Sequence, residues 1–328
     1  MDVSIVIPTW NGRPLLERFL PSVLAAADAY RAASGREVEV IVVDDGGTDD
    51  TPFWLAATHP GRVELLMKRR NEGFAHACNT GFEHARHPVV LLLNNDVEVE
   101  VGAIAPLVDH FRQPDVFAVA CQTTNLETGV ASGVGKLGRF SRGFLRVHAS
   151  YVPADPAAGE YPSIFASGGA SAFSREKLTE LGGFDTLYAP FYWEDVELSY
   201  RAWKRGWRVL FEARSRVRHR VSSTIGARFG RHHVRAVEHR NRLLAHWVHL
   251  HDPAMWRGHR AQVVLLALAA PFRLDLAFVD GLVQALGRTR EALERRAAER
   301  AAAQRSDREV LAVFDAIASR DDVRLDGL

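Results

Sequence analysis

Short apolar runs of strand length alternate with longer amphipathic segments through the first third of the chain. The apolar runs predict strands at residues 4–7, 39–43, 63–67 and 89–93. The segments between them predict helices at about residues 14–33 and 74–85, and a short capped helix after a glycine-rich turn at residues 44–51. This alternation is typical of a doubly wound α/β half-domain with a mainly parallel sheet, an arrangement that binds nucleotides.

The run at residues 89–93 is apolar without interruption and ends in Asn94, Asn95 and Asp96. Such a run fits a strand that is buried on both faces of its sheet. Because ligands of these sheets lie at the carboxyl ends of the strands, Asp96 is placed to meet a divalent cation or a phosphate. Taken alone, an ordinary Asn/Asp turn after a strand explains the same residues.

Polar residues also follow the other expected strands, and they are Thr9, Asn11, Asp44, Asp45 and Asn71. The carboxyl ends of parallel strands meet at one edge of a sheet, so we expect these side chains to converge there. A carboxylate such as Asp44 can accept a hydrogen bond from a pyrimidine imide or a ribose hydroxyl. Turn formation and helix capping explain each residue singly. The sequence contains neither the glycine-rich dinucleotide fingerprint nor a P-loop.

The second third of the chain has a different pattern. We expect a helix at residues 103–111, a strand at 116–121, and another strand at 165–173 whose small residues allow a close approach. The Gly/Ser-rich stretch at residues 128–143 predicts a mobile loop near a site.

Glu194 and Asp195 open an expected helix that runs to Arg205 and is stopped by Gly206. Acidic residues in a first turn are favoured by the helix dipole, which is sufficient reason for them to be there. The aromatic residues 191–193 just before them, however, would wall a pocket. Partial desolvation in that pocket would raise the pKa of a carboxylate toward the range of a useful base.

The C-terminal third is helical in pattern. Residues 222–250 combine arginine and histidine with leucine, valine and tryptophan on an amphipathic helix. Two interpretations are equally supported: a solvated basic face on a packing helix, or an interfacial segment on an anionic membrane leaflet. The tail at residues 288–326 is rich in Ala, Arg and Glu and predicts a helical appendage or an interaction element.

Composition narrows the class of protein. The 328 residues are 47% hydrophobic and 25% charged with a net charge of +1, which is ordinary for a globular protein and gives no global attraction to nucleic acid. The two cysteines suit a reducing compartment. No signal peptide is recognisable, and the apolar run at residues 263–272 is about half the ~20 residues of a spanning helix. We therefore expect a cytoplasmic protein.

Several motifs together resemble family 2 glycosyltransferases, which are inverting enzymes with a GT-A fold, and especially their bacterial rhamnosyltransferase-like branch. The resemblance covers residues 3–225. The matching segments are residues 4–11 (SIVIPTWN), 42–45 (VVDD), 71–75 (NEGFA) with 79–81 (NTG), 93–97 (LNNDV), 182–185 (GGFD), and 193–198 (WEDVEL) with Arg201. Residues 240–242 (RNR) also resemble a segment found beyond the catalytic domain in this branch.

The resemblance implies a role for each matching position. The nucleotide-sugar donor would be bound by Pro8, Thr9, Asn11, Asp44, Asn71, Gly73, Asn95 and Asp96, with Thr9 and Asp44 at the base and ribose. Asp195 matches the catalytic base, with Glu194 beside it.

Asp96 would also hold Mn²⁺ or Mg²⁺, and His219 occupies the place of a histidine that completes the metal site in some members. Many members have Asp-X-Asp where this chain has Asn94-Asn95-Asp96. Because the first carboxylate is missing, the cation would depend on Asp96, the donor diphosphate and His219. Oxygen ligands with one imidazole suit Mn²⁺ or Mg²⁺, with a slight preference for Mn²⁺.

These observations lead to one hypothesis and two alternatives. We expect a GT-A domain at residues 1–225, with a nucleotide-sugar half at 1–100 and an acceptor half at 101–225, followed by a helical extension at 226–328. The expected activity is metal-dependent, inverting transfer from a UDP- or dTDP-sugar to a lipid-linked or polysaccharide acceptor. Peripheral contact with the inner face of the plasma membrane, or a homo-oligomer through the C-terminal helices, would accompany it. The alternatives are an inactive glycan-binding scaffold and a sugar nucleotidyltransferase.

Overall fold

The computed structural model describes residues 1–157, 159–220, 229–270, 272 and 274–327. The strands are β1 (Val3–Thr9), β2 (Val38–Asp44), β3 (Glu64–Met67), β4 (Val89–Leu93), β5 (Val97–Val99), β6 (Val116–Asn125), β7 (Ala131–Gly133), β8 (Gly135–Ser141), β9 (Phe144–Pro153), β10 (Ala170–Ser174), β11 (Arg208–His219) and β12 (Val323–Gly327). The helices are α1 (Arg13–Ser34), α2 (Thr51–Thr58), α3 (Phe74–His84), α4 (Ile104–His110), α5 (Arg175–Leu181), η1 (Thr186–Tyr188), α6 (Glu194–Lys204), α8 (Arg231–His249), α9 (Pro253–Ala269), α10 (Leu276–Gly287), α11 (Thr289–Ala302) and α12 (Asp307–Ala318).

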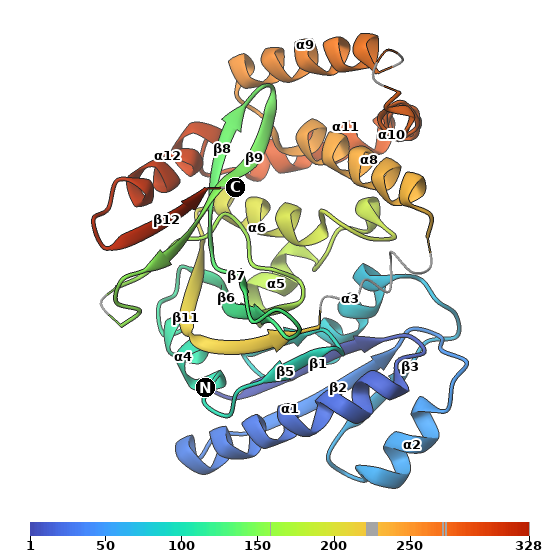
Figure 1. The fold of residues 1–328 in the computed structure, drawn as a ribbon, viewed down its shortest axis with the longest axis vertical. Helices are drawn as coiled ribbons and strands as arrows, with labels where there is room; N and C mark the ends of the chain where they lie inside the picture. Colours follow the sequence, from blue (N-terminus) through green and yellow to red (C-terminus); the bar gives the residue numbers. More distant parts are fainter. Residues whose placement is uncertain (158, 221–228, 271, 273, 328) are drawn as a thin grey trace.

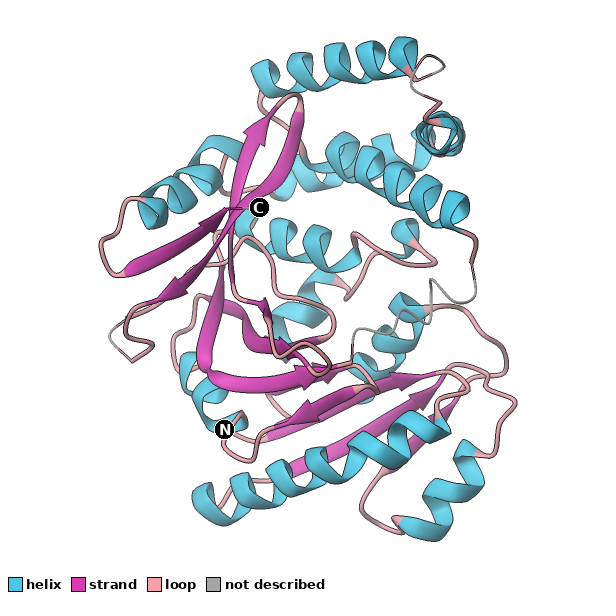
Figure 2. Cartoon of the chain, in the orientation of Figure 1, coloured by secondary structure: helices cyan, strands magenta, loops and turns pink. Residues whose placement is uncertain are grey.

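The main sheet has the strand order β3-β2-β1-β4-β10-β6-β11-β5, with β7 paired to β6. Strands β1 to β4 are all parallel, whereas β10 is antiparallel to both of its neighbours and β5 is antiparallel to β11. The expected mainly parallel α/β sheet is therefore confirmed, and β10 and β5 run against the common direction. Figures 1 and 2 show α1 and α2 on one side of the sheet and α3, α5 and α6 on the other.

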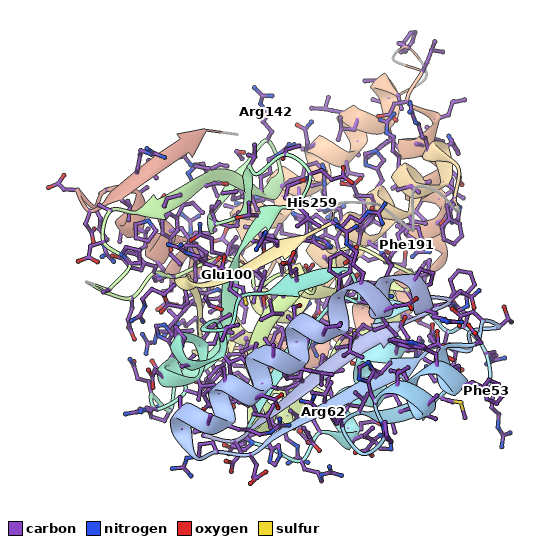
Figure 3. The ribbon with its side chains drawn as sticks, turned by 60° about the horizontal axis from the view of Figure 1, so that its bottom comes forward. Phe53, Arg62, Glu100, Arg142, Phe191 and His259 are labelled. Carbon is purple, nitrogen blue, oxygen red and sulfur yellow. The ribbon has the colours of Figure 1, made fainter. Side chains whose placement is uncertain are left out.

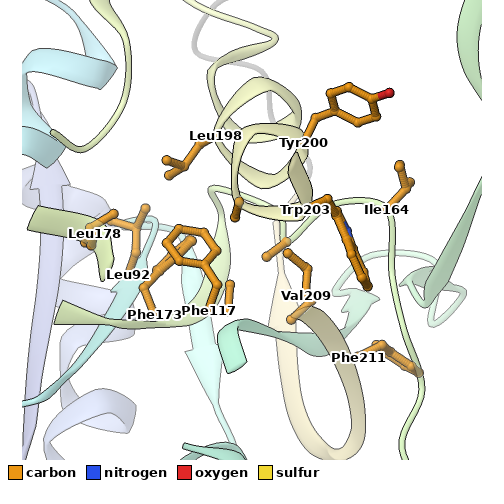
Figure 4. Packing of buried hydrophobic residues seen from close by; sticks show 14 of the residues in the cluster. Leu92, Phe117, Ile164, Phe173, Leu178, Leu198, Tyr200, Trp203, Val209 and Phe211 are labelled. Atoms are coloured by element: carbon orange, nitrogen blue, oxygen red, sulfur yellow. The ribbon is translucent and has the colours of Figure 1, made fainter. Parts of the chain in front are cut away.

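Strand β4 is buried on both faces, as its unbroken apolar sequence predicts. Val89, Leu91 and Leu93 belong to the core cluster on the α1 side. Val90 and Leu92 point to the opposite cluster, which also contains aromatic residues from β6, β10 and α6 (Figure 4). Because both faces are covered, polar side chains can gather only where the strands end.

One expectation for the middle of the chain is wrong, and another is confirmed only in part. Residues 128–143 include β7 and β8 rather than a mobile loop. Strand β8 pairs with β9, and β9 pairs with β12, which forms a second, three-stranded sheet. In addition, the expected strand at 165–173 is restricted to β10, because residues 167–169 turn toward the site described below.

The C-terminal third packs on the rest of the molecule and is not helical throughout. Helix α8 begins at Arg231, and the expected domain boundary at residue 225 and the expected helix start at 222 lie outside the described residues. The tail ends in β12, which pairs with β9. A buried ion pair of 2.9 Å joins Lys204 of α6 to Asp307 of α12. Among the described residues, no helix is both long and apolar enough to span a bilayer.

Candidate active site

The ends of β1 and β4 are tied together by their polar side chains. The Nδ2 group of Asn95 donates a hydrogen bond of 2.8 Å to Oγ1 of Thr9, which is itself 4% exposed. Pro8 is buried in β1 beside it. A Cβ atom added to Gly12 would lie 2.2 Å from Oγ1 of Thr9, so only glycine lets the turn after β1 pass this pair. The side chain of Asn95 therefore has a structural role, which is to hold the ends of β1 and β4 together.

Asp44 ends β2 and is 3% exposed. Its Oδ1 atom accepts a hydrogen bond of 3.0 Å from the backbone N–H of Gly47. Burial raises the pKa of Asp44, and the N–H of Gly47 partly opposes that shift. The carboxylate of Asp44 thus lies at the carboxyl end of β2, as the sequence predicts, and one of its oxygens is bound by the N–H of Gly47 in the turn that follows.

Asn11 lies on the rim and joins two loops. Its Oδ1 atom accepts hydrogen bonds from the backbone N–H groups of Thr48 (2.6 Å) and Asp49 (3.3 Å), and its backbone has a φ of +49°. An Asn side chain tolerates this left-handed conformation better than most residues. The described contacts of Asn11 are therefore with the chain itself.

The loop after β3 is held by Asp45, a residue outside the expected donor set. Asp45 is 3% exposed, and its Oδ2 atom accepts a hydrogen bond of 2.7 Å from the N–H of Gly73. Gly73 has a φ of +96°, and a Cβ atom there would lie 3.3 Å from the carbonyl oxygen of Pro190. Asn71 precedes it on the surface. The donor-side loop therefore contacts the segment that leads to Glu194.

Asp96 and His219 come together because β5 pairs with β11. In this pairing Val97, which follows Asp96, lies opposite His219, the last residue of β11. The Nε2 atom of His219 lies 2.9 Å from Oδ1 of Asp96. That oxygen is buried, and its recorded contact is this pairing with the imidazole. A carboxylate oxygen and an imidazole nitrogen this close together are two ligands of the kind that hold a divalent cation.

Few protein side chains are available as ligands for a cation at this site. Within the described residues, no group of three or more His, Cys, Asp or Glu side chains could hold a metal ion. Asp96 and His219 would thus supply two ligands, and the remaining positions would be filled by ligand oxygens and water. The site would have only these two protein ligands because residue 94 is asparagine, where many family members have the first carboxylate.

Asp195 and Glu194 lie in the first turn of α6. The Oδ2 atom of Asp195 accepts a hydrogen bond of 3.0 Å from the N–H of Gly168, and Oδ1 accepts one of 2.8 Å from Val196. Glu194 is 7% exposed, and its Oε2 atom has no hydrogen-bond partner in the described part of the chain.

The environments of the two acids differ. Burial, together with the charge of Asp195, raises the pKa of Glu194 to about 8. Burial also raises the pKa of Asp195, but the N–H groups of Gly168 and Val196 favour its ionised form. Adjacent carboxylates in a buried site cannot both ionise easily. The two N–H groups that bind Asp195 favour its carboxylate as the ionised member of the pair, because Oε2 of Glu194 has no such donor among the described residues.

Residues 167–169 connect Asp195 to the end of β4. The N–H of Gly168 binds Asp195, and the carbonyl oxygen of Gly169 accepts a hydrogen bond of 2.9 Å from the N–H of Asn94. A cavity of about 590 Å³, partly open to solvent, lies next to this segment and is lined by Ser167, Gly169, Lys136 and His219 among others. Asp195 and Asn94 therefore flank one short backbone segment, and His219 lines the cavity beside it.

Asn241 of helix α8, to which no role was assigned from the sequence, binds the turn that precedes Glu194 and Asp195. Tyr192 and Trp193 both have a left-handed backbone, with φ of +69° and +76°, directly before Glu194. The fully buried Nδ2 group of Asn241 in α8 lies 2.5 to 2.9 Å from the carbonyl oxygens of Tyr188, Phe191 and Tyr192. The sequence signals of this contact were one polar residue on the apolar face of α8 and the RNR segment at residues 240–242, which had been assigned no role.

A family model described as glycosyl transferase family 2 matches residues 4–182, more than half of the 328 residues. The chain belongs to glycosyl transferase family 2. It is a glycosyltransferase, as expected from its motifs, and the matched segment contains the β1, β2 and β4 edges of the site. The alternatives of a scaffold and a sugar nucleotidyltransferase are not supported by this membership.

Among similar proteins is an N-acetylglucosaminyl-diphospho-decaprenol L-rhamnosyltransferase of Mycobacterium tuberculosis. It is 28% identical over 247 residues, which cover 68% of this glycosyltransferase and 78% of the relative. This relative acts on a lipid-linked sugar by its name, and the same branch was expected from the sequence.

Solved structures show the fold. GalNAc-T7 with UDP, GalNAc and Mn²⁺ has a TM-score of 0.56 and 20% identity, covering 80% of this chain, which spans 54% of the GalNAc-T7 chain. TarS of S. aureus in complex with UDP-GlcNAc also has a TM-score of 0.56, with 15% identity and coverage of 100% of this chain and 97% of TarS. The expected GT-A fold of the glycosyltransferase is confirmed.

Proposed function

We propose that this glycosyltransferase transfers a sugar, with inversion, from a UDP- or dTDP-sugar to a lipid-linked or polysaccharide acceptor at the cytoplasmic membrane face. The observation that carries the proposal is the arrangement around residues 167–169, which binds Asp195 on one side and Asn94 on the other. A base and a diphosphate site must flank the anomeric carbon in such a reaction, and this segment lies between candidates for both. Residues 1–100 would hold the donor and 101–225 the acceptor.

The donor would lie along the strand edge. Thr9 and Asp44 would face the base and ribose, with Asn71 and Gly73 lining the same side. Pro8, Asn11 and Asn95 would shape and support this edge, as their contacts in the chain indicate. A divalent cation on Asp96 and His219 would stabilise the charge that develops on the leaving diphosphate. The carboxylate oxygen of Asp96 lies 2.9 Å from the imidazole nitrogen of His219, which fits that use.

Asp195 would take the proton of the acceptor hydroxyl as the hydroxyl oxygen attacks the anomeric carbon on the face opposite the diphosphate. The carbon–oxygen bond to the diphosphate breaks as the new glycosidic bond forms, and the attack inverts the anomeric centre. Burial of the two adjacent acids raises the pKa of both, and the hydrogen bonds to Asp195 favour that residue as the ionised one for this step. The two N–H groups on Asp195 orient its carboxylate.

The similar proteins support this choice of ligands. GalNAc-T7 was solved with UDP and Mn²⁺ and TarS with UDP-GlcNAc, and the mycobacterial relative is named for a diphospho-decaprenol acceptor. These facts concern those proteins, and they favour a nucleotide-sugar, Mn²⁺ and a lipid-linked acceptor for this one.

A thermal-shift panel tests the donor site, because a ligand that binds only the native state raises the melting temperature. We expect UDP or dTDP to raise the melting temperature of the wild type with Mn²⁺ and much less without it. Asp96→Asn should lose the metal-dependent part. Asp109→Asn, on the exposed surface of α4, is the matched control. No response to UDP, dTDP or GDP from folded wild-type protein would refute the donor assignment.

A further inference from the structure

Helix α9 presents an apolar stripe to solvent. Val264, Leu265 and Leu268 are 58%, 60% and 67% exposed. With Ala261, which is also exposed, they occupy positions i, i+3, i+4 and i+7, so they share one face of the helix. Exposed apolar side chains that form a continuous stripe indicate a contact surface.

The chain that follows α9 extends this surface. Phe272 and Leu274 are 90% and 82% exposed, and Leu276, Val283 and Leu286 of α10 are between 57% and 62% exposed. Figure 1 shows α9 and α10 at one end of the molecule, above α8 and α11. We call the exposed residues 261, 264, 265, 268, 272, 274 and 276 the α9 surface.

The segment expected from the sequence to lie on a membrane is a different one. Leu243, Leu244, Val248 and Leu250 are all buried, and three of them belong to the core cluster formed with η1 and α11. The apolar face of α8 is therefore occupied by protein, so the interpretation of α8 as a packing helix is the correct one. The apolar surface that the described residues leave exposed follows α8 in the chain.

Positive charge adjoins the α9 side of this surface, whereas Asp275 and Asp280 on its α10 side are paired with Arg235 and His232. Arg257 and Arg260 are exposed and continue the same helix face toward its N-terminus, and α9 contains no Asp or Glu. The β8–β9 hairpin adds Arg142, which is exposed and projects outward in Figure 3. The hairpin contacts α9 directly, because Nδ1 of His259 lies 2.8 Å from the carbonyl oxygen of Gly143.

We propose that the α9 surface docks on an anionic lipid bilayer, with its apolar stripe in the interface and the arginines at the headgroups. Arginine with aliphatic and aromatic residues is the composition that binds such interfaces. A second copy of the chain fits less well, because a two-fold contact would bring the arginines of both copies together. The inference extends the proposed lipid-linked acceptor, since docking would bring the enzyme to the membrane that carries it.

Vesicle co-sedimentation without any sugar donor tests this surface. We expect wild-type protein to bind vesicles of phosphatidylglycerol and phosphatidylcholine, and to bind pure phosphatidylcholine at least tenfold more weakly. Leu265→Glu with Leu268→Glu should reduce binding to anionic vesicles at least tenfold. Arg257→Gln with Arg260→Gln should reduce it severalfold and flatten its salt dependence. Phe53→Glu is the matched control, since Phe53 is 81% exposed on α2 and lies far from Arg142 in Figure 3.

Equal vesicle binding by the wild type and the Leu265/Leu268 variant would overturn the proposal. So would a dimer in light scattering that this variant dissociates while wild-type protein ignores vesicles. The melting-temperature shift with UDP or dTDP and Mn²⁺ is measured on the same proteins. A normal shift without vesicle binding would reject the docking surface alone, and vesicle binding without any shift would reject the proposed donor site alone.

Discussion

Replacing Asn241 should disable the enzyme from a helix that lies outside the matched family segment. Asn241 is fully buried in α8, and its side-chain amide lies within 2.9 Å of three carbonyl oxygens in the turn before Glu194. Asn241→Leu keeps a similar volume and removes both N–H donors. Asn241→Asp keeps the shape and, when ionised, brings a negative charge against the same carbonyl oxygens.

The size of the effect follows from the hydrogen bonds and the backbone. Each buried carbonyl left without a donor costs about 1–3 kcal/mol, and two donors are lost. The left-handed residues Tyr192 and Trp193 store about 1–2 kcal/mol each, which the turn regains if it relaxes. We therefore expect the free energy of unfolding to fall by about 2–6 kcal/mol if the turn keeps its shape, and by less if it relaxes. Relaxation would displace Glu194 and Asp195, and a shift of about 1 Å can cost roughly 100-fold in kcat.

The assay combines urea unfolding with steady-state sugar transfer. Both Asn241 variants should lower kcat by about 10- to 100-fold, with little change in the apparent affinity for the donor, because Thr9 and Asp44 lie on other strands. Glu238→Gln is the control, since Glu238 is exposed on the same helix. If Asn241→Leu unfolds at the wild-type urea concentration and keeps kcat within twofold, Asn241 does not hold the turn and the reasoning is wrong.

Three further results are expected. Asp195→Asn should lower kcat by about 10²- to 10⁴-fold while the UDP-induced thermal shift persists, and near-wild-type turnover of the variant would exclude Asp195 as the base. Since burial raises the pKa of Asp195, wild-type kcat should fall as the pH is lowered through that raised pKa. His219→Ala should raise the Mn²⁺ concentration needed for half-maximal activity about tenfold, and an unchanged requirement would remove His219 from the metal site. Burial lowers the pKa of His259 to about 4, so the folded protein keeps this imidazole neutral while the unfolded chain protonates below pH ~6.5. Its contribution to stability is therefore present above pH ~6.5 and is lost as the pH falls toward 4; between pH 6.5 and 5 it amounts to about 2 kcal/mol, which His259→Phe should remove from the pH dependence of urea unfolding.

Local sequence was sufficient for the parts of the site that depend on single strands and helices. The unbroken apolar run of β4 predicted a strand buried on both faces, because no polar side chain interrupts it. Asp44 and Asp96 could be placed at strand ends for the same reason, since a change from apolar to polar residues marks where burial stops. The start of α6 at Glu194 was likewise readable from its acids and from Gly206 beyond its end.

Tertiary structure decided whatever depends on residues far apart in the chain. The pairing of β5 with β11 brings Asp96 to His219. The Gly/Ser-rich residues 128–143 were predicted to form a loop, because the sheet of β8, β9 and β12 is completed only by residues near the C-terminus. Amphipathic patterns mark an apolar face without saying what covers it, so α8 was open to a membrane interpretation although protein buries it. The role of Asn241 was hidden for the same reason: one amide acquires three carbonyl partners only when α8 packs against the turn before Glu194.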